Sequence, residues 1–209
     1  MNPIRINRAT LSVAIWEQFV ANPGALDHEL LKSLEELRAQ ADYNTGSVGL
    51  LDVIDLQGIV QHFQPRVVAE VGTFIGRSTA AMATAMPKGG VIYTCDFSNA
   101  ITLPQLATDV LVQQFQKKSS TEMFEELISR KVKVDLFYID GRLTQKDLRL
   151  VWELAHQNTV IVLDDFEGVE KGVANAMGLL TQGHVLVYPR KGGKTAMILP
   201  GGLLEFTAQ

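Results

Sequence analysis

Two glycines four residues apart follow a short apolar run and could form a turn that receives a ligand. The stretch reads Glu70-Val71-Gly72-Thr73-Phe74-Ile75-Gly76-Arg77-Ser78. Glycine adopts backbone conformations that other residues avoid, and it lets a ligand lie against bare backbone. Ser78 would open a helix, whose free N–H groups favour an anionic group. The pattern therefore predicts a strand, a tight turn and a helix around an anionic part of a ligand.

An acid on the next apolar run extends this candidate site. Asp96 ends the run Val91–Asp96 and lies 24 residues beyond Gly72. Rossmann-type folds place a carboxylate at this point, where it accepts hydrogen bonds from two ribose hydroxyls. Either feature alone fits an ordinary turn or a solvated strand end. Together, at this spacing, they favour a nucleoside site at two adjacent strand ends.

Three more carboxylates follow two later apolar runs. Asp140 comes after Phe137-Tyr138-Ile139, and the pair Asp164-Asp165 comes after Ile161-Val162-Leu163. The ligand crevice of an open parallel sheet lies at the carboxyl ends of its strands, so these acids should converge. Crowded carboxylates repel unless a proton or cation intervenes, and oxygen ligands suit Mg²⁺. The three acids are therefore candidate magnesium ligands, with helix capping as the alternative role for the second of the pair.

Alternating strands and helices must position these residues. Short apolar runs separated by amphipathic stretches predict a parallel sheet with helices on both faces. Only Arg190-Lys191-Gly192-Gly193 joins the last two runs, so these form an antiparallel hairpin. We predict an α/β fold, a Rossmann-like doubly wound sheet of five parallel strands plus a C-terminal antiparallel hairpin. The predicted strands cover residues 67–71, 91–96, 110–115, 134–140 and 159–165, with the hairpin over 184–189 and 194–200.

Helices precede this sheet. A first helix carries Trp16 and Phe19 on one apolar face, a second follows Asp27, and a third covers residues 50–63 and ends before Pro65. The stripe of Trp16 and Phe19 is typical of a face that packs on the core. A lid or the contact of a homodimer is the other role that such a face could have.

Length and composition limit the classes of protein. A chain of 209 residues suits one domain, here a helical extension over 1–46 and a Rossmann-like core over 47–209. The net charge of −4 and the scattered 19 Lys and Arg argue against nucleic acid as the partner. No apolar run reaches the roughly 18 residues of a membrane span. The single cysteine, Cys95, excludes an internal disulfide, so we expect a cytoplasmic protein. The partner that we expect is a small molecule.

The glycine turn resembles motif I of the class I methyltransferases that use S-adenosylmethionine, E-x-G-x-x-x-G-x-S. Within that class the chain is most similar to the small O-methyltransferases of the catechol type and their bacterial relatives, over about residues 47–200. The resemblance implies that Gly72 and Gly76 flank the methionine part of the cofactor. Ser78 would hold its carboxylate, and Glu70 would lie beneath the turn near its amino group.

The same resemblance assigns the rest of the cofactor. Asp96 would bind the ribose and Phe97 would pack on the adenine. Thr73 and Asp140 complete the set of residues that it predicts to touch the cofactor. Asp140 is also a catalytic candidate, because it would lie near the methyl group that is transferred.

Metal-dependent members of the family suggest how the acids would work. They take one Asp after the fourth strand and an Asp-Asn or Asp-Asp pair after the fifth, which Asp140, Asp164 and Asp165 match. The ion would hold the hydroxyls of the substrate and lower their pKa. These members usually carry a lysine three residues after the first Asp, and other members a histidine, whereas this chain has Leu143. Lys146 is a catalytic candidate from the same loop, although its spacing differs.

The leading hypothesis is a methyltransferase that uses S-adenosylmethionine and Mg²⁺ to methylate an oxygen of a small molecule. A metal-free methyltransferase, acting on oxygen or nitrogen, is the main alternative. A nucleoside-binding protein without turnover is a further alternative, which Leu143 favours. A nicotinamide oxidoreductase is disfavoured, because Phe74 stands where the G-x-G-x-x-G pattern has its second glycine.

Overall fold

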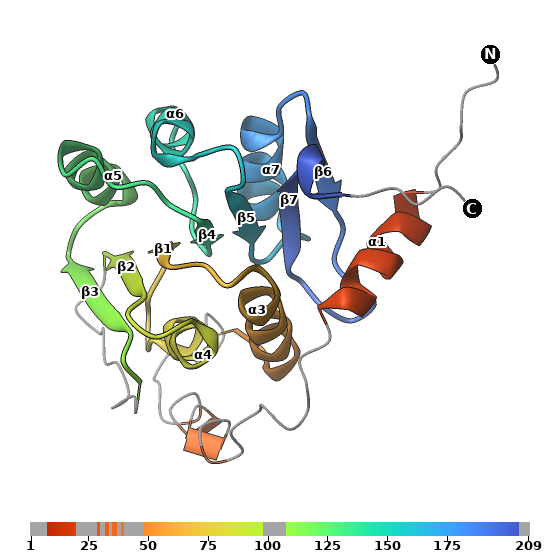
Figure 1. Cartoon of the computed structure of the whole chain (residues 1–209), viewed down its shortest axis with the longest axis horizontal. Helices are drawn as coiled ribbons and strands as arrows, with labels where there is room; N and C mark the ends of the chain where they lie inside the picture. Colours follow the sequence, from red (N-terminus) through yellow and green to blue (C-terminus); the bar gives the residue numbers. More distant parts are fainter. Residues whose placement is uncertain are drawn as a thin grey trace.

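The computed structural model describes residues 8–19, 48–97 and 108–204, together with residues 29, 32, 33, 35, 36 and 39. Within these residues, one sheet has helices on both faces, as Figure 1 shows. Its strands are β1 Val67–Val71, β2 Val91–Asp96, β3 Leu111–Gln116, β4 Leu136–Ile139, β5 Val160–Leu163, β6 His184–Val187 and β7 Ala196–Pro200. The helices are α1 Arg8–Gln18, α3 Leu50–Phe63, α4 Arg77–Ala85, α5 Ser120–Ser129, α6 Gln145–Leu154 and α7 Ala174–Leu179, with a π-helix η3 over Val169–Val173 and a 3-10 turn η4 over Gly201–Leu203.

The order of the strands confirms the predicted sheet. It runs β3-β2-β1-β4-β5-β7-β6, and neighbours among β1 to β5 are parallel. β7 is antiparallel to both β5 and β6, so the hairpin closes one edge with β7 on the inside. The order reverses between β1 and β4. In sheets of this kind a ligand binds at the carboxyl ends of the strands beside such a reversal.

Two hydrophobic cores lie on the two faces of the sheet. Successive residues of β1, Val68 and Ala69, point into opposite cores, as the two-residue period of a strand requires. One core includes residues of α1, α3 and α4, and the other includes residues of α5, α6 and α7. Cys95 lies in the second core, where burial raises the pKa of its thiol to about 12. Helices on both faces explain why the strand sequences are almost continuously apolar.

The helices before the sheet agree with the sequence where they are described. α3 has the predicted bounds, and Gln64 follows it in a left-handed conformation. Trp16 of α1 and Phe19, which directly follows α1, are buried inside the chain, and the Trp16 Nε1–H donates to the Tyr188 carbonyl oxygen at 2.6 Å. The core-facing role predicted for this stripe is thus confirmed. The helix predicted after Asp27 and the boundary at residues 46 and 47 fall largely or wholly outside the described residues. Among the described helices, none is long and apolar enough to cross a bilayer.

Candidate active site

The turn after β1 is held by backbone hydrogen bonds to the end of β2. The N–H groups of Gly72 and Thr73 donate to the Cys95 carbonyl oxygen at 3.0 and 3.3 Å. Gly72 has a φ of +98°, and a Cβ there would lie 2.7 Å from the Asp140 carbonyl oxygen. Gly76 has a φ of +76° and is the N-cap of α4. Both positions therefore favour glycine, and the close approach at Gly72 joins the ends of β1 and β4.

Beneath the turn, Glu70 is bonded to the first residues of α4. Its side chain is fully buried, and Oε1 and Oε2 accept hydrogen bonds from the hydroxyls of Ser78 and Thr79, each at 2.5 Å. Burial raises the pKa of Glu70, and the hydroxyl donors oppose that rise. Thr73 is also buried, and its hydroxyl pairs with the hydroxyl of Thr94. The side chains of Glu70, Thr73 and Ser78, predicted to touch the cofactor, thus bind protein groups and shape the turn.

Asp96 and Phe97 extend this site to the end of β2. The Asp96 Oδ2 atom accepts a hydrogen bond from the Phe74 N–H at 2.7 Å. Phe74 has a φ of +45°, a conformation that costs a residue with a side chain about 1–3 kcal/mol. Asp96 therefore holds the turn in a strained shape. Phe97 is 77% exposed, so its ring is available to a ligand beside the turn.

The hollow next to the turn is small in this structure. Its volume is about 10 Å³, far below that of a nucleoside site. Val48, which lies just before α3, is one of the residues that close it. The lining residues are Val48, Gly72, Thr73, Phe74, Ile75, Arg77, Ser78 and Asp140. A ligand of nucleoside size would need more room than these lining residues leave in this structure.

The three acids predicted from the strand ends do converge. One carboxylate oxygen each of Asp140, Asp164 and Asp165 lies within 4.8 Å of the other two. Asp164 is only 5% exposed, and its Oδ1 has no hydrogen-bond partner among the described residues. Burial, with repulsion from Asp140 and Asp165, raises the pKa of Asp164 to about 8. Burial also raises the pKa of Asp140 to about 6, against the opposing effect of Lys171.

Lys171 supplies a positive charge to this cluster. Its Nζ forms ion pairs with Asp140 and with Asp165, the latter at 2.8 Å. Burial would raise the pKa of Asp165, but Lys171 and Lys194 outweigh it and the pKa is lowered. Burial would lower the pKa of Lys171, but the two acids outweigh it and the pKa is raised. Because the Lys171 ammonium pairs with two of the three acids, the cluster does not fit a divalent ion in addition.

The backbone after β5 places Lys171 beside the acids. Asp165 has a φ of +47°, and its carbonyl oxygen accepts the Gly168 N–H at 2.8 Å, so the chain turns back on itself. The π-helix η3 follows, and such helices are frequent at functional sites. A Cβ at Gly172 would lie 2.4 Å from the Cα of Phe166, so only glycine permits this contact. Lys171 was not among the site residues predicted from the sequence. Its place between Gly168 and Gly172 is the signal that could have identified it.

Lys146, the other catalytic candidate, is not brought to the cluster. It lies on α6, and its Nζ pairs with Glu125 of α5 at 2.5 Å, with both side chains about half exposed. Leu143 is partly buried against the second core, and its N–H donates to the Asn175 Oδ1 at 3.1 Å. Arg142 pairs with Glu170. The loop after β4 therefore stabilises the surroundings of Asp140 without adding a cation to the acids.

A cavity of about 390 Å³ opens beside Lys171. Its charged side chains are of both signs, which suits a polar molecule better than an apolar one. The lining residues are Arg142, Asp165, Glu167, Gly168, Glu170, Lys171 and Lys194. This cavity is the candidate acceptor site, because it adjoins the acids next to the glycine turn.

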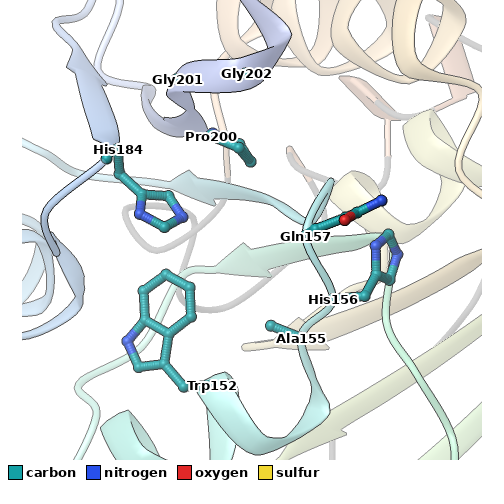
Figure 2. A pocket seen from close by; sticks show the side chains of 9 residues that line it. Trp152, Ala155, His156, Gln157, His184, Pro200, Gly201 and Gly202 are labelled. Atoms are coloured by element: carbon teal, nitrogen blue, oxygen red, sulfur yellow. The ribbon is translucent and has the colours of Figure 1, made fainter.

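A second cavity, of about 520 Å³, lies at the opposite ends of the strands. Figure 2 shows Trp152 and His184 on one side of it and His156 and Gln157 on another. The ring centroids of Trp152 and His184 are 4.9 Å apart, and the His156 Nε2 is 2.9 Å from the Asp135 Oδ1. These residues precede β5 or begin β6, so the cavity lies at amino ends. Its size does not make it the candidate site, because ligands of such sheets bind at carboxyl ends.

A known family matches part of the chain. Residues 69–166 match the family model described as a methyltransferase domain. The matched part begins within β1 and ends just after Asp165, so it includes both the glycine turn and the three acids. No curated protein sequence matches the chain at a significant level.

Solved structures share the fold of this chain at low sequence identity. An O-methyltransferase from Bacillus cereus, in complex with SAH, is 17% identical with a TM-score of 0.64, covering 90% of this chain and 99% of that one. TomG from Streptomyces achromogenes, an O-methyltransferase of tomaymycin synthesis in complex with SAM, is 16% identical with a TM-score of 0.63, covering 94% and 99%. SAH-bound PaMTH1 from Podospora anserina is 13% identical with a TM-score of 0.64, covering 95% and 97%. The predicted fold is thereby confirmed.

Proposed function

We propose that this chain is a class I methyltransferase that transfers the methyl group of S-adenosylmethionine to an oxygen of a small, polar acceptor, without a divalent ion. The observation that carries the proposal is the contact between the glycine turn and the acids. Gly72 lies against the backbone of Asp140, and the Asp140 carboxylate pairs with Lys171 at the edge of a cavity. A cofactor at the turn and an acceptor in the cavity would meet at Asp140. The O-methyltransferases among the structural neighbours support oxygen as the acceptor atom.

The residues of the turn suit the cofactor. Gly72 and Gly76 would lie against its methionine part, and the exposed ring of Phe97 would pack on the adenine. Asp96 would bind the ribose while it still holds the Phe74 N–H, because a carboxylate has about four acceptor positions. The hollow at the turn would have to widen when the cofactor binds, because its volume is only about 10 Å³. We therefore assign Asp96 a double role, in shaping the turn and in binding the ribose.

Asp140 is the candidate for a direct part in the reaction. When it is bound, S-adenosylmethionine supplies a methyl group on a positively charged sulfur. In the proposed reaction the acceptor oxygen would bond to this methyl group as the bond to sulfur breaks, and sulfur would keep the electron pair. The Asp140 carboxylate would take the proton of the acceptor hydroxyl. Most of the rate increase would come from alignment of the acceptor with the methyl group.

Cofactor binding tests this function without knowledge of the acceptor. We expect SAH to bind in a calorimetric titration and to raise the melting temperature, whereas NAD raises it little at the same concentration. Asp96→Ala should weaken SAH binding by about 1.5–3 kcal/mol, the range for a hydrogen bond to a charged group. Asp109→Ala, which removes an acid that pairs with Lys88 on the surface, is the matched control. If SAH does not bind, or binds Asp96→Ala and the wild type equally, the proposed cofactor site is wrong.

Transfer is then measured with labelled S-adenosylmethionine and a panel of small hydroxyl compounds, in EDTA and in Mg²⁺. The proposal expects the same rate in both conditions. A rate that falls to background in EDTA and returns with Mg²⁺ would contradict the metal-free reaction and support the magnesium hypothesis.

A further inference from the structure

Lys171 differs from the other cations near the acids. Its Nζ contacts two carboxylates, and its side chain is only 20% exposed. The Lys194 Nζ lies 3.7 Å from the Asp165 Oδ1, and the Lys194 side chain is 58% exposed. Arg142 pairs with Glu170, which is also exposed. Lys194 and Arg142 are surface partners of single acids, whereas Lys171 joins acids that follow two different strands. Among the described residues, it is the cation at the centre of the cluster.

The position of Lys171 is set by the backbone. η3 packs directly on Phe166 because Gly172 has no side chain, and the Lys171 N–H donates to the Gly168 carbonyl oxygen at 3.1 Å. The segment from Asp165 to Lys171 is therefore short, and its backbone turns back on itself. The Lys171 side chain is only 20% exposed, so water screens its ion pairs less than it screens a pair of fully exposed surface residues.

The Lys171 ammonium has one N–H without an acceptor in the part of the chain that the structure describes. A lysine ammonium has three donors, and Asp140 and Asp165 accept two of them. Lys171 also lines the cavity of about 390 Å³, so a molecule in that cavity can reach it. Asp140, which lies against the glycine turn, is within the same ion pair. An oxygen bound to Lys171 would therefore lie near the end of the cofactor that carries the methyl group.

We infer that Lys171 is the built-in cation of the acceptor site: its ammonium takes the place between the acids that a divalent ion would need, and it holds the acceptor oxygen for methylation. This inference rests on the proposed function for the identity of the acceptor atom. The exclusion of the ion rests only on the contacts of Lys171. Lys171 is thus a residue that binds substrate, and the acids around it position its ammonium.

Removal of the ammonium should turn the cluster into a metal site. One oxygen of each acid lies within 4.8 Å of the other two. Bonds of about 2.0–2.6 Å from one Mg²⁺ or Ca²⁺ could reach oxygens at such separations. Without Lys171 the three carboxylates repel one another and have an open position between them. The variant should therefore gain affinity for a divalent ion that the wild type lacks.

The test uses the full chain as the wild type, Lys171→Ala and Lys171→Met, with Lys194→Ala as the matched control that removes a nearby lysine from outside the cluster. Each protein is titrated with Mg²⁺ and with Ca²⁺ by calorimetry, and its melting temperature is measured in each ion and in EDTA. We expect both Lys171 variants to bind an ion at least about tenfold more tightly than the wild type and to melt several degrees higher with it. Lys194→Ala should show no such gain, and Asp164→Asn added to Lys171→Ala should abolish it.

SAH affinity separates the two proposals. Lys171→Ala should bind SAH within about threefold of the wild type but lose transfer in EDTA at least about tenfold, with part of it restored by Mg²⁺. Absence of SAH binding to the wild type would contradict the proposed function and leave the metal titration to decide on Lys171. Mg²⁺ binding to the wild type that Asp164→Asn removes, or no gain in the Lys171 variants, would overturn the inference. Lys171→Met keeps the aliphatic stem, so it serves if Lys171→Ala does not fold.

Discussion

At the ends of β1 and β2, Glu70 is surrounded by hydroxyl donors, whereas at the ends of β4 and β5 the Asp164 Oδ1 has no partner among the described residues. Both acids are buried, and both have raised pKa values. The hydroxyls around Glu70 make the turn a rigid support for the cofactor. The acids after β4 and β5 repel one another and depend on the Lys171 ammonium for their charge balance. Hydroxyl donors thus stabilise the acid at one pair of strand ends, and a cation stabilises the acids at the neighbouring pair.

The rigid half of the site depends most on Gly72. Gly72→Ala should lower the free energy of unfolding by about 2–5 kcal/mol, because it adds a left-handed alanine and a contact of 2.7 Å with the Asp140 backbone. Gly89→Ala is the control, since Gly89 has a φ of +74° but nothing within 4 Å of its Cβ. It should cost only about 1–2 kcal/mol. Urea unfolding of both variants tests this, and equal losses would mean that the two strand ends are not coupled at Gly72.

Glu70 tests whether its hydroxyl donors matter. Glu70→Gln replaces an acceptor oxygen with an amide N–H₂ that faces the hydroxyl of Ser78 or Thr79. We expect a loss of about 1–3 kcal/mol, the cost of a buried hydrogen bond that is not made. Urea unfolding and the SAH affinity should both change, because the turn loses its support. Glu153→Gln, at an exposed position of α6, is the control and should change neither.

Replacement of Asp164 should stabilise the fold, unlike replacement of Glu70, and the gain should depend on pH. The pKa of Asp164 in the folded chain is about 8, above the usual 3.8. The stability that the wild-type side chain contributes is therefore complete below about pH 4 and is lost as the pH rises towards 8. Asp164→Asn cannot ionise and escapes this loss. The variant should therefore gain stability relative to the wild type between about pH 5 and 8, with no further gain above 8. Urea unfolding across this range checks the sign, and a constant difference between the proteins would show that Asp164 is already ionised in the fold.

Lys146 should have the smallest effect. Its ion pair with Glu125 is half exposed, so Lys146→Ala should change the free energy of unfolding by less than about 1 kcal/mol. SAH affinity and methyl transfer should remain those of the wild type. A large loss of transfer would return Lys146 to the candidate catalytic residues and would reduce the case for Lys171.

Local patterns in the sequence were enough to predict much of the fold. The bounds of α3, β1 and β2 match the predicted ranges, because their apolar runs end at clear signals such as Pro65 and the first glycine of the turn. The predicted strands over 134–140 and 159–165 are shorter in the structure, where the acids lie just beyond the paired residues. The convergence of those acids was predictable as well, since parallel strands bring their carboxyl ends to the same edge.

The sequence by itself determined the sheet, the glycine turn and the three acids, since each depends on short-range spacing and on the rule for parallel strands. Only the tertiary structure decided what the polar side chains contact. The Ser78 hydroxyl donates to Glu70, and Lys146 forms an ion pair with Glu125. Lys171 pairs with Asp140, which is 31 residues away in the sequence. A π-helix and a glycine packed on a backbone make that last contact, and neither has a sequence period that would reveal it. The charge balance of the acids is therefore a property of the folded chain.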